Sequence, residues 1–317
     1  MNTNRHSSPL RLSVFGALVA LLALASTSPL AASRRGWLKE SSTVTRSFRI
    51  APGEGQRRLV IDNVLGSVEV RTGGSSDTVE LTLTQTYEAA DAGEMARAKS
   101  DVELEVREEA GKLVLLQGGP WRCSGNDRRR HRDAEDDDWG DGCCCGDHGD
   151  RDYEVTFDWT LTVPKTLDLW VRNVNDGEIR IDGVHGRLRV RHVNDDVRLT
   201  NVGGTLDAQT VNGELKVEFD SLPTGGLEFA TVNGDVDLTF PAGFGAELSF
   251  HTLNGEVYTD FPFTLANRPP PPVSAKDDRK GHHRRSTSRQ TVATLGTGGV
   301  AVDCSTVNGD ITIRERG

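Results

Sequence analysis

Residues 188–217 read LRVRHVNDDVRLTNVGGTLDAQTVNGELKV, and their apolar side chains recur at a fixed rhythm. These apolar residues are Leu188, Val190, Val193, Val197, Leu199, Val202, Leu206, Ala208, Val211, Leu215 and Val217. The steps between them are 2, 3, 4, 2, 3, 4, 2, 3, 4 and 2 residues, so the half-repeat is nine residues long. A step of two indicates two inward side chains of one short strand, because side chains alternate between the faces of a strand. Neither a helical stripe nor a long hairpin gives this series, so we predict an all-β fold, a β-solenoid of stacked short strands.

An asparagine, in most copies followed by glycine, occupies one corner of each predicted coil. The asparagines are Asn175, Asn194, Asn212, Asn233, Asn254 and Asn308, at spacings of 19, 18, 21, 21 and 54 residues. The last spacing contains an insertion, and subtracting about thirty residues restores a period typical of repeat proteins. Asn and Gly tolerate tight corners, and stacked coils would place these Asn side chains above one another as a hydrogen-bonded turn ladder. Glycan binding by the same asparagines is the functional alternative.

The residue before each of these asparagines occupies one phase of the rhythm. We predict that this position forms a single interior column, consisting of Val193, Val211, Val232, Leu253 and Val307. On that prediction, Val211→Asp would bury an unpaired charge and strongly destabilise the protein. Cys304 shares the phase of Ala208 and of two phenylalanines, Phe229 and Phe250, so we expect it to be a buried, inert thiol.

The rhythm also appears near both ends of the mature chain, at residues 59–70 and 302–313. Between the first copy and the main array, residues 79–83, 102–106 and 153–163 alternate as ordinary strands, and residues 89–100 have the pattern of a short helix. We therefore predict one domain over residues 45–317, irregular near its start and regular after about Leu167.

The N-terminal segment has the pattern of a secretory signal peptide. Arg5 and Arg11 give a positively charged start, a short apolar stretch follows at residues 14–24, and small residues come after it. The apolar stretch is too short to cross a bilayer comfortably. We predict a signal peptide at residues 1–33 and an exported protein in the periplasm, at the cell surface or outside the cell; an uncleaved anchor is the alternative.

Two segments lack apolar periodicity, and we predict disordered insertions at residues 118–152 and 267–297. The first carries six Arg against ten acidic residues. Its Cys123, Cys143, Cys145 and His148 are a candidate metal site, because thiolate and imidazole suit zinc or copper. A disulfide from Cys123 to one of residues 143–145 and free thiols are the alternatives. Deleting residues 118–152 is expected to leave the fold intact.

The second insertion is strongly cationic. Residues 267–291 carry seven Lys or Arg against two Asp, next to four consecutive prolines. A stiffened cationic arm would bind anionic envelope polymers or a membrane surface, with an affinity that falls as salt rises. The candidate contacts are Arg279, Lys280, Arg284 and Arg285. A solvated linker without a partner is the alternative.

The repeated Thr-Val-Asn-Gly unit resembles a known family. It occurs at residues 210–215, 231–236 and 306–311, with a near copy at 252–257. With the short helix, the strand pair and the strand ending in Val163-Pro164-Lys165, it is similar to the bacterial putative-adhesin family of exported β-strand repeat proteins. The resemblance covers residues 45–316 and implies a β-solenoid-like fold with an adhesive or scaffold role. It supplies no catalytic residues, and the charged insertions depart from the pattern.

Composition and motifs narrow the function. A net charge of −10 argues against a dedicated nucleic-acid binder. The chain has no nucleophile elbow, zinc-protease motif or phosphate loop. We predict a non-enzymatic exported protein that presents a surface for adhesion or envelope interaction, without cofactor. One alternative is a metal- or redox-responsive envelope protein. Another is a polysaccharide-active enzyme on a β-helix, for which Arg180, Arg187, Arg189, Arg191 and Arg198 near Asp195 and Asp196 are the candidates.

Overall fold

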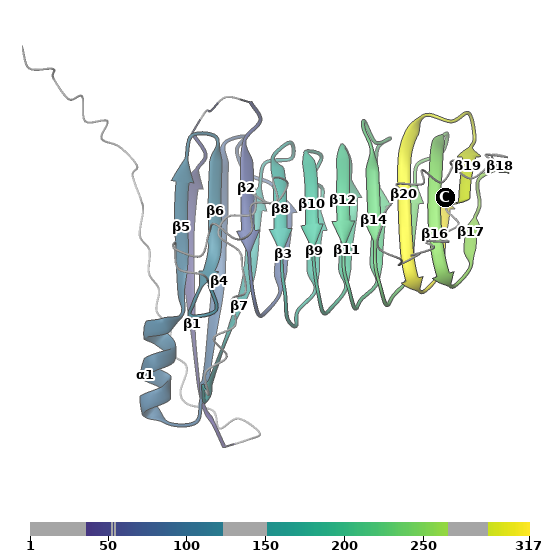
Figure 1. Ribbon diagram of the computed structural model, residues 1–317. Coiled ribbons are helices and arrows are strands. Elements are labelled where there is room, and N and C mark those ends of the chain that lie inside the picture. The colour runs from purple at the N-terminus through teal and green to yellow at the C-terminus, as the bar shows by residue number, and fades with distance from the viewer. Residues whose placement is uncertain (1–35, 52, 54, 123–150, 266–290) are drawn as a thin grey trace, which may run out of the picture.

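The computed structural model describes residues 36–51, 53, 55–122, 151–265 and 291–317, and it consists of two facing β-sheets and one helix (Figure 1). Sheet A has ten strands, in spatial order β1 (Leu38–Arg49), β4 (Thr78–Ala89), β7 (Tyr153–Val163), β3 (Val68–Thr72), β9 (Ile179–Asp182), β11 (Val197–Val202), β13 (Leu215–Phe219), β15 (Val236–Phe240), β21 (Ile311–Glu315) and β17 (Val257–Thr259). Sheet B has eleven, in the order β18 (Phe263–Leu265), β19 (Thr291–Leu295), β16 (Ala246–Asn254), β20 (Val300–Asn308), β14 (Leu227–Ala230), β12 (Thr205–Gln209), β10 (Arg187–Arg191), β8 (Asp168–Arg172), β2 (Arg58–Asp62), β6 (Lys112–Gly118) and β5 (Glu103–Glu109).

The chain passes alternately from sheet B to sheet A, one strand in each per coil, and the coils stack through parallel pairing. Leu188 of β10 lies beside Leu206 of β12, which lies beside Leu227 of β14. The apolar residues at these positions are buried between the sheets. The predicted β-solenoid is confirmed.

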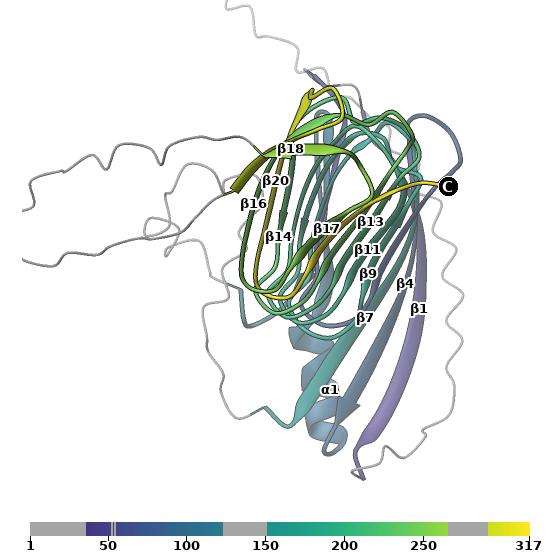
Figure 2. The same ribbon diagram turned by 90° about the vertical axis from the view of Figure 1, so that its right-hand side faces the viewer.

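The N-terminal part departs from this pattern, as predicted. Here β1, β4 and β7 are long antiparallel strands that extend past the coils, and α1 (Ala92–Asp101) packs beside them (Figure 2). Asp91 caps α1 by accepting hydrogen bonds from the backbone N–H groups of Gly93 and Glu94, at 2.7 and 2.9 Å. In the described residues, no helix is both long and apolar enough to span a membrane.

The predicted interior column at the Asn corner is wrong. Val193, Val211 and Val232 are 36%, 38% and 39% exposed, and Leu253 is 68% exposed. Val307 is half-buried.

The inward position is the polar residue just before each of these apolar residues. His192, Thr210, Thr231 and Thr306 are buried there. Thr210 Oγ1 donates to the carbonyl of Asp195 in the preceding coil, Thr231 Oγ1 to that of Gly213, and Thr306 Oγ1 to that of Gly234, each at 3.1 Å. Carbonyl groups buried at a corner need donors, so a hydroxyl is favoured inside and valine is turned outward. Val211→Asp is therefore expected to be tolerated.

The last coil in the sequence is not the last coil in space. β20 lies between β14 and β16, and β21 lies between β15 and β17. Cys304 is fully buried beside Phe229 on one side and Phe250 on the other, and its burial raises the pKa of the thiol. The expected buried position of Cys304 is confirmed, whereas the stacking order could not be foreseen from the repeat.

Both predicted insertions are shorter in the structure. Gly118 is the last residue of β6, and the Arg122 guanidinium lies 2.6 Å from the Asp62 carboxylate. Residues 291–295 form β19, which pairs antiparallel with β16. The predicted limits 118–152 and 267–297 therefore include residues that belong to the fold, because a few residues at a strand end or in a five-residue strand carry little periodicity.

Candidate functional site

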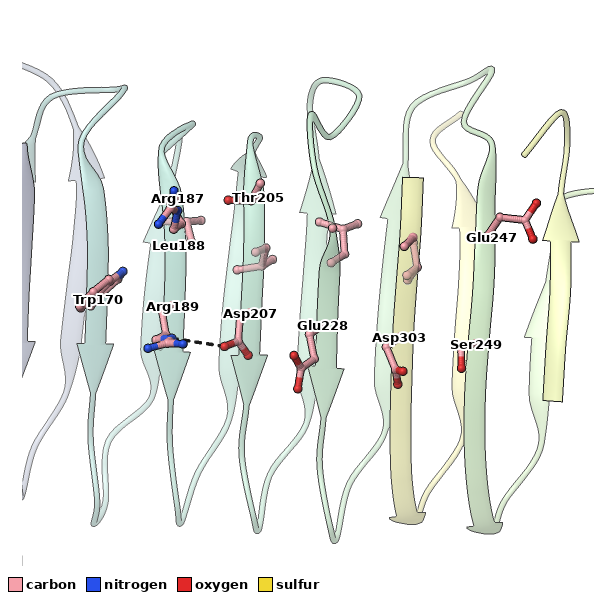
Figure 3. Close-up of a pocket in the computed structure, with 15 residues that line it drawn as sticks. Trp170, Arg187, Leu188, Arg189, Thr205, Asp207, Glu228, Glu247, Ser249 and Asp303 are labelled. Atoms are coloured by element: carbon pink, nitrogen blue, oxygen red, sulfur yellow. Dashed lines mark ion pairs between the residues drawn. The ribbon is translucent and has the colours of Figure 1, made fainter. Parts of the chain in front are cut away.

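A groove of about 500 Å³ lies on the outer face of sheet B. It extends from Trp170 of β8 across β10, β12, β14, β20 and β16, and every one of these strands contributes lining residues (Figure 3). Gly226 and Ala301 are among the lining residues, and because their side chains are absent or small they leave space above the sheet. The groove is formed by residues of neighbouring strands that are stacked in register, and no separate loop covers it among the residues that line it.

One row of side chains forms the wall of this groove. Across the strands, the groove row consists of Trp170, Arg189, Asp207, Glu228, Asp303 and Ser249. Each member lies between the two inward residues of its strand, as Asp207 lies between Leu206 and Ala208. The row changes from aromatic through cationic to anionic along the solenoid.

The cationic end of the groove row is internally neutralised. Arg189 Nε lies 3.4 Å from Asp207 Oδ2, and Arg191 Nη1 donates to Asp207 Oδ1 at 2.7 Å. The guanidinium carbons of Arg58 and Arg189 lie 3.6 and 5.4 Å from the centre of the Trp170 ring. Trp170 is only 2% exposed, so it supports the arginines by cation–π contact and is not an open stacking platform.

The anionic end is organised differently. Glu228 lies beside Asp207 on one side and Asp303 on the other, and like charges directly opposite each other destabilise a sheet. Glu228 accepts a hydrogen bond from Gln209 Nε2 at 3.0 Å, and Glu247 accepts one from Thr294 Oγ1 at 3.1 Å. This end of the groove therefore presents the carboxylates of Glu228, Asp303 and Glu247 on one face of the sheet.

The six asparagines of the predicted turn ladder lie above one another along one corner of the solenoid. Nδ2 of each donates to Oδ1 of its neighbour: Asn194 to Asn175 at 3.0 Å, Asn212 to Asn194 at 2.9 Å, Asn233 to Asn212 at 2.8 Å, Asn308 to Asn233 at 2.7 Å and Asn254 to Asn308 at 2.8 Å. Their spatial order follows the coils, so Asn308 comes before Asn254. The amides bond one another, which fits a structural role.

The arginines and aspartates considered for a polysaccharide-active enzyme do not converge. Arg180 and Arg198 lie on sheet A and pair with Glu178, whereas Arg187, Arg189 and Arg191 lie on sheet B. Asp195 accepts the backbone N–H of Gly177 at 3.0 Å, and Asp196 accepts that of Glu214 at 2.8 Å, so both carboxylates serve the corners.

The other predicted site residues lie outside the described residues. These are Cys123, Cys143, Cys145 and His148 of the candidate metal site, and Arg279, Lys280, Arg284 and Arg285 of the candidate polyanion contact. Within the ranges that the structure describes, no three His, Cys, Asp or Glu side chains are placed together as ligands for a metal ion.

Most of the groove row was not predicted from the sequence. Trp170, Asp207, Glu228, Asp303 and Ser249 were not singled out, although each lies midway in a step of two in the apolar rhythm. That position identifies the outward residue of the sheet B strand in every coil. The rhythm could therefore have located the row, but not the hollow above Gly226 and Ala301.

Comparisons with known proteins agree with this architecture. A family model described as Toastrack DUF4097 matches residues 168–314, the array from β8 to β21. No curated protein matches the chain. Three crystal structures are similar, each at 11% identity and over 87% of this chain.

The first is a putative cell adhesion protein from Clostridium sporogenes, covered over its full length with a TM-score of 0.42. The second is a putative adhesin from Bacteroides fragilis, covered over 97% with a TM-score of 0.36. The third is a putative lipid binding protein from Parabacteroides distasonis, covered over 97% with a TM-score of 0.23. Residues 168–314 are thus similar to the Toastrack DUF4097 family, in accordance with the putative-adhesin resemblance of the repeated motif.

Proposed function

We propose that this protein is an exported, non-enzymatic, adhesin-like protein that binds a cell-surface or envelope component through the groove on the outer face of sheet B. The observation that carries the proposal is the groove row, which aligns one outward side chain from each of six strands over a shallow hollow. An open, extended groove suits part of a long polymer, whereas enclosed pockets suit small molecules.

The proposal is also supported by the arrangement of like charges along the groove row. The carboxylates of Asp207, Glu228 and Asp303 lie on neighbouring strands of one face, and Arg189 and Arg191 both approach Asp207. A ligand that donates hydrogen bonds to Glu228 and Asp303 would relieve their repulsion, since charge-assisted hydrogen bonds are stronger than neutral ones. Binding is therefore expected to depend on these two carboxylates.

The test compares fluorescently labelled wild-type protein with the variant Glu228→Gln/Asp303→Asn, by flow cytometry on fixed Gram-negative and Gram-positive bacterial cells. The variant keeps the shape of the row and removes two charges. We expect its cell binding to fall roughly tenfold or more, as for the loss of two charge-assisted contacts.

The matched control is Glu218→Gln/Asp237→Asn, which makes the same chemical changes on the outer face of sheet A. This control is expected to bind as the wild type does. Equal binding by the groove variant and the wild type, or no binding by the wild type to either kind of cell, would refute the groove as the contact.

Export is proposed from the N-terminal sequence alone. Fusing residues 1–45 to an alkaline phosphatase that is active only outside the cytoplasm tests it. We expect activity, and a shorter mature chain after cleavage near residue 33. An inactive fusion would contradict export.

A further inference from the structure

The outer face of the long strands β1, β4 and β7 has an unusual composition. Five rows of three outward side chains cross these strands. The end row, Lys39–Glu88–Glu154, is charged, but ten of the twelve positions in the other four rows are Ser or Thr. These four rows are Ser41–Thr86–Thr156, Thr43–Thr84–Asp158, Thr45–Thr82–Thr160 and Ser47–Glu80–Thr162. We call these ten Ser and Thr residues the hydroxyl face; all of them are exposed or half-buried.

The hydroxyl face lies on the side of the sheet opposite α1. Met95 and Ala98 of α1 are buried in the same core as Tyr87 and Tyr153, which alternate with the hydroxyl residues along β4 and β7. Figure 2 shows these three strands extending past the coils, away from the sheet B groove. The two surfaces are therefore separate.

Strand propensity alone does not account for the hydroxyl face. Thr is common at outward strand positions because it is β-branched. The same outer face of sheet A, however, is mostly charged in the stacked coils, where the outward residues are Glu69, Arg71, Arg180, Asp182, Arg198, Thr200, Lys216, Glu218, Asp237, Thr239, Thr312 and Arg314. The Ser- and Thr-rich stretch therefore lies between the charged outer face of the coils and the charged row Lys39–Glu88–Glu154.

Most hydroxyls of this face have spare hydrogen-bonding capacity. Ser41 lies 3.5 Å from Thr86 and Thr43 lies 3.5 Å from Thr84, measured between hydroxyl oxygens, which is long for such a bond. The remaining hydroxyls have no hydrogen-bond partner in the described part of the chain. Asp158, by contrast, accepts the backbone N–H and the hydroxyl of Ser67 at 2.9 and 2.7 Å, so its charge is already engaged.

This geometry selects the chemistry of a ligand. Each Thr presents a hydroxyl that both donates and accepts, next to a methyl group. Strands lie about 4.8 Å apart and alternate residues about 6.8 Å apart, so the hydroxyl face is a strip about 20 Å long and 10 Å wide. An uncharged polysaccharide offers the complementary pattern of hydroxyl edges and C–H ring faces. Polyanions and polycations are disfavoured, because the strip has almost no free charge to pair with them.

We infer that the hydroxyl face is a binding site for an uncharged polysaccharide, distinct from the groove of the proposed function. Each hydroxyl contributes little, because hydrogen bonds to solvent are exchanged for hydrogen bonds to the ligand. Binding therefore depends on many contacts along an extended chain. It is also expected to be insensitive to salt, since no ion pair forms.

The experiment measures co-sedimentation of the purified mature protein with insoluble cellulose, chitin, β-1,3-glucan and mannan. The test variant is Thr82→Val/Thr84→Val/Thr86→Val in β4, which keeps the β-branched shape and removes three hydroxyls. Thr43→Val/Thr45→Val in β1 is a second, independent variant. The matched control is Thr239→Val/Thr312→Val, which makes the same change on the same face of sheet A within the coils.

We expect the wild type to sediment with at least one of the four polymers, equally at low and high salt. The triple variant should bind at least about tenfold more weakly, as expected for three lost hydrogen bonds of ordinary net strength. The control and the groove variant Glu228→Gln/Asp303→Asn should bind as the wild type does.

Three results would overturn the inference: no sedimentation with any of the four polymers, undiminished binding by both β4 and β1 variants, or binding that disappears at high salt. Because valine has high strand propensity, the variants should fold; circular dichroism and thermal unfolding check this. The groove variant distinguishes the two proposals. If it loses binding to cells but still sediments with the polysaccharide, the groove and the hydroxyl face are separate binding sites.

Discussion

Each of the four residues 210–213 has a different structural role at one corner of the solenoid. Thr210 donates to a carbonyl of the preceding coil, Val211 points outward, and Asn212 joins the ladder. A Cβ atom on Gly213 would lie 2.0 Å from the carbonyl oxygen of Asp195, so only glycine lets the coils approach. The motif recurs because each position meets the same neighbour one coil away.

His192 replaces threonine at the inward position of one corner. Val193 N–H donates to His192 Nδ1 at 2.8 Å, which leaves the ring proton on Nε2, 3.0 Å from the carbonyl oxygen of Gly177. His192 is 3% exposed, and burial lowers its pKa below the ordinary value of 6.5. Protonation of Nδ1 would break the bond from Val193.

This predicts a pH-dependent stability. The unfolded state takes up the proton first, so the stability contributed by neutral His192 is complete above about pH 6.5 and is lost as pH falls below it. We expect the Tm of the wild type to fall between neutral and mildly acidic pH by several degrees more than that of His192→Thr, measured by circular dichroism. Parallel pH profiles of the two proteins would contradict this assignment.

At the scale of elements, a buried ion pair attaches the chain after β6 to sheet B. Asp62 is 1% exposed, and it lies 2.6 Å from Arg122 Nη1 and 3.4 Å from Arg172 Nε. Arg122 also donates to the carbonyl oxygens of Gln117 and Asp62, at 2.7 and 2.9 Å. Removing Arg122 leaves the buried Asp62 carboxylate with Arg172 alone, at the longer distance, and weakened pairing of a buried charge is costly.

Two deletions around this segment should therefore differ in their effect on the Tm. Removing residues 123–150 with a short linker is expected to keep the Tm within a few degrees, whereas removing residues 118–152 should lower it strongly, because Arg122 is lost. Arg122→Ala alone should cost about 3 kcal/mol in the free energy of unfolding, measured with urea.

The control for this prediction is Arg71→Ala, which breaks the exposed ion pair with Glu69 and should cost less than about 1 kcal/mol. Equal stability of the two deletions would show that Arg122 does not anchor this segment.

At the scale of the whole molecule, the C-terminal coil is enclosed between two others. β20 and β21 pair on both sides, and Val302, Cys304, Ile311 and Ile313 are almost completely buried. The described solenoid is thus completed by the last residues of the chain. The outermost coil, β16 and β17, contacts the rest of the array through this inserted coil.

We therefore expect truncation after Gly299 to lower the free energy of unfolding by about 6 kcal/mol or more, since four buried apolar side chains are lost. Thermal unfolding of the truncated chain measures this, and removal of Gly317 alone serves as the control. If the truncated chain kept the wild-type Tm, the outer coil would have closed directly onto β14 and β15.

The period of the coils, the corner asparagines and the short helix could be predicted from the sequence. They depend on local alternation and turn chemistry, which a nine-residue rhythm records directly. The register at the corner could not, because the burial of Thr210 is understood only when the carbonyl that it faces in the preceding coil is known; Val211 is then turned outward.

The stacking order, the groove and the hydroxyl face depend on contacts between residues distant in the sequence. Coils with the same Thr-Val-Asn-Gly motif fit equally well in either order, so the repeat does not say that Asn308 precedes Asn254. Likewise, Glu228 meets Asp303 only because β20 enters beside β14. A periodic sequence specifies what each coil buries, whereas the pairing of strands far apart in the chain determines which surfaces the molecule presents.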